Sequence, residues 1–116
     1  MPASTDTVFG KILRGEIPAT FLHQDDRCVA IRDIRPAAPL HALVIPRKPL
    51  TSLAEATEED AALLGHLLVV ARQVAEAAGY GDAFRLVANT GAEAGQSVPH
   101  LHFHVLGGRE LAWPPG

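Results

Sequence analysis

Apolar residues recur at helical spacing in the middle of the chain, between residues 61 and 78. They comprise Leu64, Leu67, Leu68, Ala71, Val74, Ala75 and Ala78. This spacing matches the period of an α-helix, so it predicts a long helix with one apolar face. Thr57 is the expected N-cap, because the three acidic residues after it favour the positive end of a helix dipole. Gly79 is the expected stop.

A second, shorter helix is predicted near the N-terminus. Its apolar face comprises Phe9, Ile12 and Leu13. Thr5 or Asp6 is a candidate N-cap, and Gly15 is expected to end the helix.

Other segments have the composition of strands. Residues 19–34 predict two strands around the turn residues Asp25 and Asp26. Residues 41–45 form an apolar run between prolines and predict a buried strand. Residues 83–90 predict a further strand, which a glycine-rich connection joins to the next segment.

That next segment, "HLHFHVL", alternates histidine with apolar residues from His100 to Leu106. Residues two apart share one face of a strand but not of a helix, so the alternation predicts a strand. Its apolar face comprises Leu101, Phe103 and Val105, and its other face comprises His100, His102 and His104. The glycines at 107 and 108 end the run, and an extended tail follows.

Two helices and several strands without regular alternation predict an α+β fold, with a mostly antiparallel sheet of about five strands. At 116 residues, of which 47% are hydrophobic, the chain is expected to form a single domain over residues 1–116. The net charge of −3 argues against a general nucleic-acid binder.

Cysteine usage and apolar runs bear on the compartment. Cys28 is the only cysteine, so no disulfide forms within the chain, and a reducing compartment is expected. The first residues lack the pattern of a secretory signal, and the longest apolar stretch is too short to cross a membrane. We therefore expect a soluble cytoplasmic protein that does not bind membranes.

The three alternating histidines allow three interpretations. They could be incidental residues on a solvated strand face, although such faces usually carry other polar residues. They could bind zinc, but His100 and His104 would lie ~13 Å apart along a strand, so one ion would need another ligand such as His41. They could be catalytic, because a neutral imidazole can attack phosphorus while a neighbouring histidine assists the leaving group.

Residues outside the histidine segment could hold a phosphorylated ligand. Glycines in residues 89–97 allow backbone N–H groups to converge on an anion, and Asn89 and Ser97 add polar side chains. Asp33 could accept hydrogen bonds from a ribose diol or could cap a turn before Pro36. His23 and His66 are expected to be structural.

The string "HLHFHVL" resembles the His-φ-His-φ-His-φ-φ signature of the histidine triad (HIT) superfamily. Further strings are similar to its Hint branch, the histidine triad nucleotide-binding proteins. They are "DTVFGKILRGEIPA", "DDRCVAIRDI", "HALVIPRKP", "LLGHL", "GQSVPHLHFHVLGGRE" and "WPPG". The ending fits less well with the branch of dinucleoside polyphosphate hydrolases.

The resemblance implies a homodimer that binds purine nucleotides such as AMP. It also implies a hydrolase without cofactor or metal, which cleaves nucleoside 5′-phosphoramidates to nucleoside monophosphate and amine. By matching positions, His102 would be the nucleophile and His104 would contact the phosphate and assist the leaving group. His100 and His41 would orient the nucleophile through a hydrogen-bonded relay.

The resemblance also assigns a nucleotide pocket. The phosphate would be surrounded by Asn89, Gly95, Gln96 and Ser97, with Ser97 near the leaving group. The ribose would be held by Asp33 and Ile34. The pocket for the base would be lined by Phe9, Ile12 and Ile17. Trp113 would lie near the site of the partner subunit.

Some positions depart from the family pattern. Pro99 precedes the triad where an aromatic residue is familiar, and Arg32 and Leu40 replace a histidine and a threonine. These changes bear on base and leaving-group preference.

Two alternatives to a phosphoramidase stay open on the sequence: a nucleotide-binding regulator with incidental turnover, and a metal-dependent hydrolase. Because the cysteine pair of the zinc-containing relatives is missing, we expect no metal.

Overall fold

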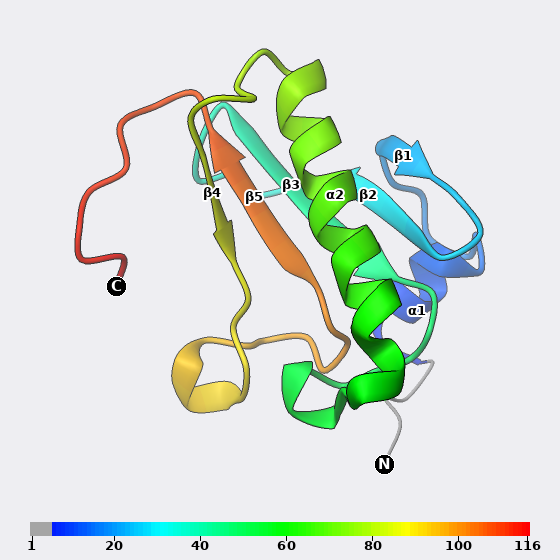
Figure 1. Ribbon diagram of the computed structural model, residues 1–116. Coiled ribbons are helices and arrows are strands. Elements are labelled where there is room, and N and C mark those ends of the chain that lie inside the picture. The colour runs from blue at the N-terminus through cyan, green and yellow to red at the C-terminus, as the bar shows by residue number, and fades with distance from the viewer. Residues whose placement is uncertain (1–5) are drawn as a thin grey trace.

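A five-stranded antiparallel sheet with two helices forms the protein in a computed structural model that describes residues 6–116 (Figure 1). In chain order the elements are α1 (Val8–Leu13), β1 (Phe21–Gln24), β2 (Cys28–Arg32), β3 (Leu40–Pro46), the 3-10 turns η1 (Leu53–Glu55) and η2 (Glu58–Asp60), α2 (Ala61–Ala77), β4 (Phe84–Val87), the 3-10 turn η3 (Ala92–Ala94) and β5 (Phe103–Gly107). The strand order is β1-β2-β3-β5-β4, and every neighbouring pair is antiparallel. The prediction of an α+β fold is confirmed.

The two helices cover opposite faces of the sheet, as Figure 1 shows. One face packs against α2 through Ala42, Val44 and Val105, which contact Leu67 and Ala71 in one apolar cluster. The other face packs against α1 in a smaller cluster of Phe9, Ile12, Val29, Ile31, Leu43 and Ile45. Because side chains alternate along a strand, each of β2 and β3 supplies residues to both clusters.

The short helix begins later than predicted. Its N-cap is Thr7, whose Oγ1 accepts a hydrogen bond from the N–H of Gly10 at 3.0 Å. Asp6 is not the cap, and Thr5 lies outside the described residues. Thr7 fits because its extended backbone lets the side chain turn back onto the free N–H groups of the first turn.

The long helix also starts later than predicted, because Thr57 caps the 3-10 turn η2 instead. Thr57 and Asp60 form a reciprocal capping box, and α2 follows from Ala61. Two predicted core positions are wrong: Leu68 is 45% exposed and Ala78 is exposed, whereas Val70 is buried. Only one narrow face of α2 packs against the sheet, and Leu68 lies outside that face.

The histidine segment enters the sheet later than expected. Strand β5 begins at Phe103, so His100 and His102 precede it. The reason lies in the backbone: the N–H of His100 donates to the carbonyl of Val98, and that of Leu101 to the carbonyl of Leu50. These amides are therefore engaged outside the sheet. The alternation still holds, since Leu101, Phe103 and Val105 all join the cluster beneath α2.

Among residues 6–116, every helix is too short or too polar to span a lipid bilayer.

Gly108 marks a tight reversal directly after β5. Its φ of +93° lies in the region that favours glycine, and a Cβ there would lie 2.8 Å from Cβ of Pro39 and 2.9 Å from the Tyr80 ring. Gly15 has a similar φ of +77° but open space around it. The two positions therefore separate backbone strain from steric overlap.

We expect Gly108→Ala to lower the free energy of unfolding by ~2–4 kcal/mol, because strain and overpacking add. The matched Gly15→Ala variant has strain alone and should lose ~1–2 kcal/mol. Urea denaturation of both variants measures the difference. Equal losses would contradict the close approach of Pro39 and Tyr80 to Gly108.

Candidate active site

Pairing between β3 and β5 brings two histidines from distant parts of the chain together. Leu43 pairs with His104, and His41 pairs with Leu106. Residues opposite each other in an antiparallel pair share a face, so His41 and His104 are diagonal neighbours on one face. Their rings are hydrogen bonded, with His41 Nε2 and His104 Nδ1 2.9 Å apart.

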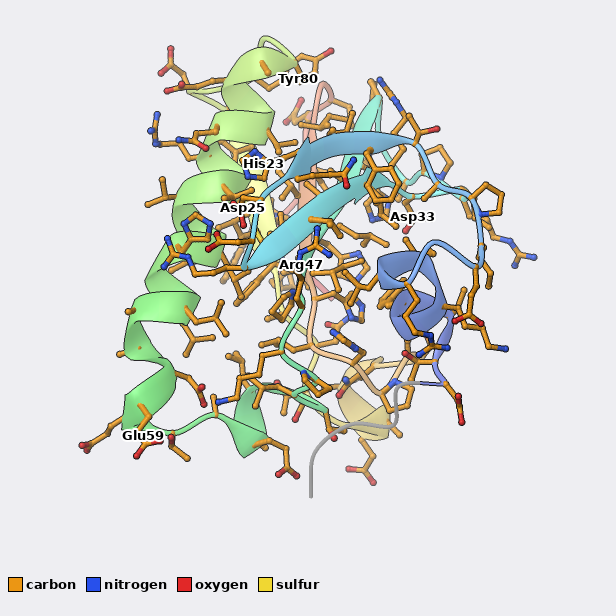
Figure 2. All side chains as sticks on the ribbon, turned by 90° about the vertical axis from the view of Figure 1, so that its right-hand side faces the viewer. His23, Asp25, Asp33, Arg47, Glu59 and Tyr80 are labelled. Atoms are coloured by element: carbon orange, nitrogen blue, oxygen red, sulfur yellow. The ribbon has the colours of Figure 1, made fainter. Side chains whose placement is uncertain are left out.

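An open pocket of about 370 Å³ lies on this face, between the sheet and α1. Two of the three triad histidines, His102 and His104, line it. The other lining residues are Val8, Phe9, Ile12, Ile31, Arg32, Asp33, Ile34, Arg35, Leu43, Ser97 and Val98. Apolar residues thus dominate the α1 side, whereas polar groups gather near the histidines. In Figure 2, Asp33 lies on the side of the sheet that carries α1.

A backbone hydrogen bond fixes the protonation pattern of His102. Its Nδ1 lies 2.7 Å from the carbonyl oxygen of His100. A carbonyl only accepts, so Nδ1 carries the proton and donates it. In the neutral ring Nε2 then bears the lone pair. The edge of the Phe9 ring packs against the imidazole, with 4.9 Å between ring centroids.

His104 has the opposite pattern, which follows from its contact with His41. The N–H of Ala37 donates to His41 Nδ1 at 2.9 Å, so the proton of His41 sits on Nε2. His41 Nε2 then donates to His104 Nδ1, with Oδ2 of Asp33 3.3 Å away. The neutral His104 ring consequently carries its own proton on Nε2. One ring of the pocket can therefore attack and its neighbour can donate a hydrogen bond.

His100 lies outside the pocket and is buried, with 1% of its surface exposed. Its Nε2 donates to the carbonyl of Pro46 at 2.8 Å. Its Nδ1 finds no hydrogen-bond partner among residues 6–116. The relay expected from the resemblance thus has two separate branches: the carbonyl of His100 holds His102, and His41 holds His104.

Burial keeps the triad neutral. It lowers the pKa of His102, against the opposing effects of the His100 carbonyl and the Asp33 carboxylate. Burial also lowers the pKa of His104 to about 4, and the neighbouring His102 and His41 rings add to the shift. The pKa of His100 is lowered by burial as well. All three imidazoles are therefore neutral near neutral pH.

The glycine-rich connection is held by Gln96. Its Oε1 accepts from the N–H of Gly91 at 2.9 Å, and its Nε2 donates to the carbonyls of Thr51 and Val98. Asn89 lies beside Gly95, where a Cβ would be 3.6 Å from Asn89 Nδ2. Of the residues assigned to the phosphate, Ser97 lines the pocket, whereas Asn89, Gly95 and Gln96 lie outside its lining.

The remaining assigned residues divide between the pocket and its surroundings. Phe9, Ile12, Asp33 and Ile34 line it, although Ile34 is 92% exposed. Ile17 packs beside the apolar cluster under α1 instead. Asp33 also accepts a hydrogen bond from the N–H of Arg35, so the turn predicted at this position is present.

The C-terminal tail lies along the far edge of the sheet. Arg85 donates to the carbonyls of Leu111 and Ala112, and Arg109 donates to the carbonyl of Ala37 at 2.9 Å. Trp113 follows and is 82% exposed.

Sequence reasoning missed several lining residues. Ile31 and Leu43 could have been found from the alternation along their strands, since both share the face of His104. Arg32 was noted only as a departure from the family pattern. No local signal identifies Arg35, because its place at the pocket depends on how the chain turns after β2.

The fold and the site together define an α+β protein with a histidine-lined pocket, and comparisons with known proteins agree. The HIT domain family model matches residues 14–111. An uncharacterized HIT-like protein of Synechocystis sp. is 60% identical over 111 residues, covering 96% of this chain and 97% of the relative.

Solved structures give the same result. A HIT family hydrolase from Legionella pneumophila superimposes with a TM-score of 0.93 at 44% identity, covering 96% of this chain and all of that one. A HIT family hydrolase from Clostridium thermocellum has a TM-score of 0.89 at 42% identity, covering 92% of this chain and 94% of that one. The chain therefore belongs to the HIT family.

The hydrogen bonds predict distinct tautomers for the two pocket histidines. At neutral pH we expect the Nδ1–H form of His102 and the Nε2–H form of His104, both of which nitrogen NMR of labelled imidazoles distinguishes. Because burial disfavours the charged ring, His104 should stay neutral on acidification until about pH 4. Protonation of His104 near its ordinary value of 6.5 would contradict this environment.

Proposed function

We propose that the protein is a nucleotide-binding hydrolase that cleaves the P–N bond of nucleoside 5′-phosphoramidates. The products would be a nucleoside monophosphate and an amine, formed through a covalent nucleotidyl-histidine intermediate. The observation that carries the proposal is the paired protonation pattern of His102 and His104 in one pocket. The relatives described as HIT family hydrolases support the reaction class.

The first step uses the lone pair of His102 Nε2. This nitrogen attacks phosphorus, a P–N bond to the enzyme forms, and the P–N bond to the amine breaks as the departing nitrogen takes a proton from solvent in the open pocket. The ring then carries positive charge, because both of its nitrogens are substituted. The carbonyl of His100, which accepts from Nδ1 at 2.7 Å, stabilises that charge. In the second step water attacks phosphorus, a P–O bond forms and the P–N bond to His102 breaks. The proton lost by the water goes to solvent, and Nε2 of His102 regains its lone pair.

His104 and Ser97 act on the phosphoryl group and the leaving group. The Nε2–H of His104 donates to a phosphoryl oxygen, where negative charge develops in the transition state. His41 and Asp33 act behind it, since they hold the tautomer that places the proton on that nitrogen. The Ser97 hydroxyl also lines the pocket, and its proposed role is to contact the departing amine.

The rest of the pocket suits a nucleoside. Phe9 and Ile12 provide apolar lining for a purine base, and Asp33 provides a carboxylate for the ribose hydroxyls. Arg32 and Arg35 add two positive charges to the lining, which favour a phosphorylated ligand. No cofactor takes part in the proposed reaction.

Three further properties extend the proposal, on the basis of the family resemblance. The protein is assigned to the Hint branch and to the cytoplasm. It acts as a homodimer, in which Trp113 approaches the site of the partner subunit. The exposure of Leu68 and Val69 on α2, 45% each, supports an apolar interface along that helix.

Single-turnover incubation with adenosine 5′-phosphoramidate tests the reaction. His102→Ala should slow amine release by at least ~10³-fold, because the nucleophile is gone. His104→Ala should slow it by ~10²-fold, because it loses only a hydrogen-bond donor. Intact-mass spectrometry of quenched samples should find a nucleotidyl group on the wild type and none on His102→Ala. Amine release at an unchanged rate from His102→Ala would rule the mechanism out.

Light scattering tests the dimer. At micromolar concentration the wild type should have twice the mass of one chain, and Leu68→Asp should shift the equilibrium toward the monomer because it places a charge in the apolar interface. A wild type that stays monomeric would contradict the proposed assembly.

A further inference from the structure

A second group of chemistry-bearing side chains lies on the sheet face opposite the pocket, beneath α2. It comprises His23 on β1, Asp25 in the β1–β2 turn, Cys28 on β2 and His66 on α2. One ligand atom of each lies within 4.8 Å of those of all the others. Figure 2 shows His23 and Asp25 beside α2, away from Asp33 and α1.

The side chains of this cluster converge on a single oxygen. Oδ2 of Asp25 lies 2.7 Å from Nε2 of His23 and 2.7 Å from Nε2 of His66. Sγ of Cys28 lies 3.6 Å from the same oxygen. The other carboxylate oxygen accepts the backbone N–H groups of Arg27 and Cys28, which fixes the orientation of Asp25. Three donors therefore point at one centre. A single divalent cation could bind there if the thiol proton of Cys28 leaves to solvent and the Nε2 protons of His23 and His66 move to Nδ1.

We infer that His23, Asp25, Cys28 and His66 form a zinc site. Two imidazoles, a thiolate and a carboxylate are the donors that zinc binds in tetrahedral geometry. This assignment departs from the expectation of no metal, and it gives the structural role expected for His23 and His66 a specific chemical form. It does not depend on the proposed hydrolase activity.

The three separations that involve Oδ2 of Asp25 can reach tetrahedral values with small adjustments. With zinc bonds of ~2.0–2.3 Å, ligand atoms of a tetrahedral site lie ~3.3–3.6 Å apart. The Asp25 to Cys28 separation of 3.6 Å already falls in this range. The two separations of 2.7 Å must open by ~0.6 Å. Side-chain rotation can provide this, since His23 and His66 are 28% and 21% exposed and lie at the surface.

Charge balance favours the ion despite two nearby guanidinium groups. Arg27 donates to Nδ1 of His66 at 3.1 Å, and Arg47 donates to the carbonyl of Asp25. The negative charges of the Asp25 carboxylate and a Cys28 thiolate cancel the two charges of zinc, so the occupied site is neutral. Coordination at His66 Nε2 moves the ring proton to Nδ1. Arg27, which is exposed, must then turn away from His66.

The site would act as a structural clamp. Its ligands come from β1, β2 and α2, so one ion joins the edge of the sheet to the helix that covers it. Zinc that binds the folded chain but not the unfolded chain raises the stability of the fold. The second group with similar spacing, Asp33, His41 and His104, belongs to the pocket already described and serves as an internal control.

Zinc titration against a competing chelator tests the site in the full chain. The wild type should bind one Zn²⁺ per chain, and His23→Gln should bind it at least ~tenfold more weakly. Loss of a residue that only supports a metal ligand already weakens binding by about that factor, and His23 is itself a ligand. Gln can still donate a hydrogen bond to Asp25, so this variant keeps the metal-free contacts. The control His104→Ala should bind zinc like the wild type.

Two further measurements identify the ligands and separate this site from catalysis. With Co²⁺ as the probe, the wild type should show a thiolate charge-transfer band that Cys28→Ser lacks. Zinc should raise the melting temperature of the wild type but not of His23→Gln, whose hydrolysis of phosphoramidate should be normal. Absence of saturable zinc binding, equal affinity in the wild type and His23→Gln, or loss of zinc only in His104→Ala would each overturn the inference.

Discussion

The antiparallel pairing of β3 with β5 is the constraint on which the site depends. It sets His41 diagonally across from His104, and the resulting hydrogen bond of 2.9 Å selects the tautomer of the ring that faces the pocket. A shift of one residue in this register would turn His104 toward α2 and Val105 toward the pocket. The apolar contacts of Val105 beneath α2 therefore hold the chemistry in place, because they make any other register costly.

The sheet thus separates two tasks that use similar side chains. On the α1 face, burial keeps the imidazoles neutral. The carbonyl of His100 and the ring of His41 give His102 and His104 each a defined proton. On the α2 face, the hydrogen bonds from His23, the Arg27 backbone N–H and His66 overcome the effect of burial and hold the pKa of Asp25 far below its usual range. The first environment favours a nucleophile, whereas the second presents a fixed anion with its partners around it. Histidines of the same chain differ in role because their hydrogen-bond partners differ.

The sequence alone predicts much of the fold, because its alternation and helical periods are local properties. It identifies both helices, a strand over residues 41–45 that lies within β3, and the apolar face of the histidine segment. It misplaces Leu68 in the core and starts the last strand at His100, because those details depend on the packing of α2 and on amides bonded to distant carbonyls. The grouping of His66 with Cys28 also needs the three-dimensional structure, since nothing local links residues so far apart.

Ala37 has a wider reach than its small side chain suggests. Its N–H holds the ring of His41, while its carbonyl accepts the side chain of Arg109 at the start of the C-terminal tail. A single peptide segment is therefore shared by the C-terminal tail and by the ring that sets the tautomer of His104. A displacement of Arg109 would act first on the segment that orients His41, so the position of the tail bears on the geometry of the pocket.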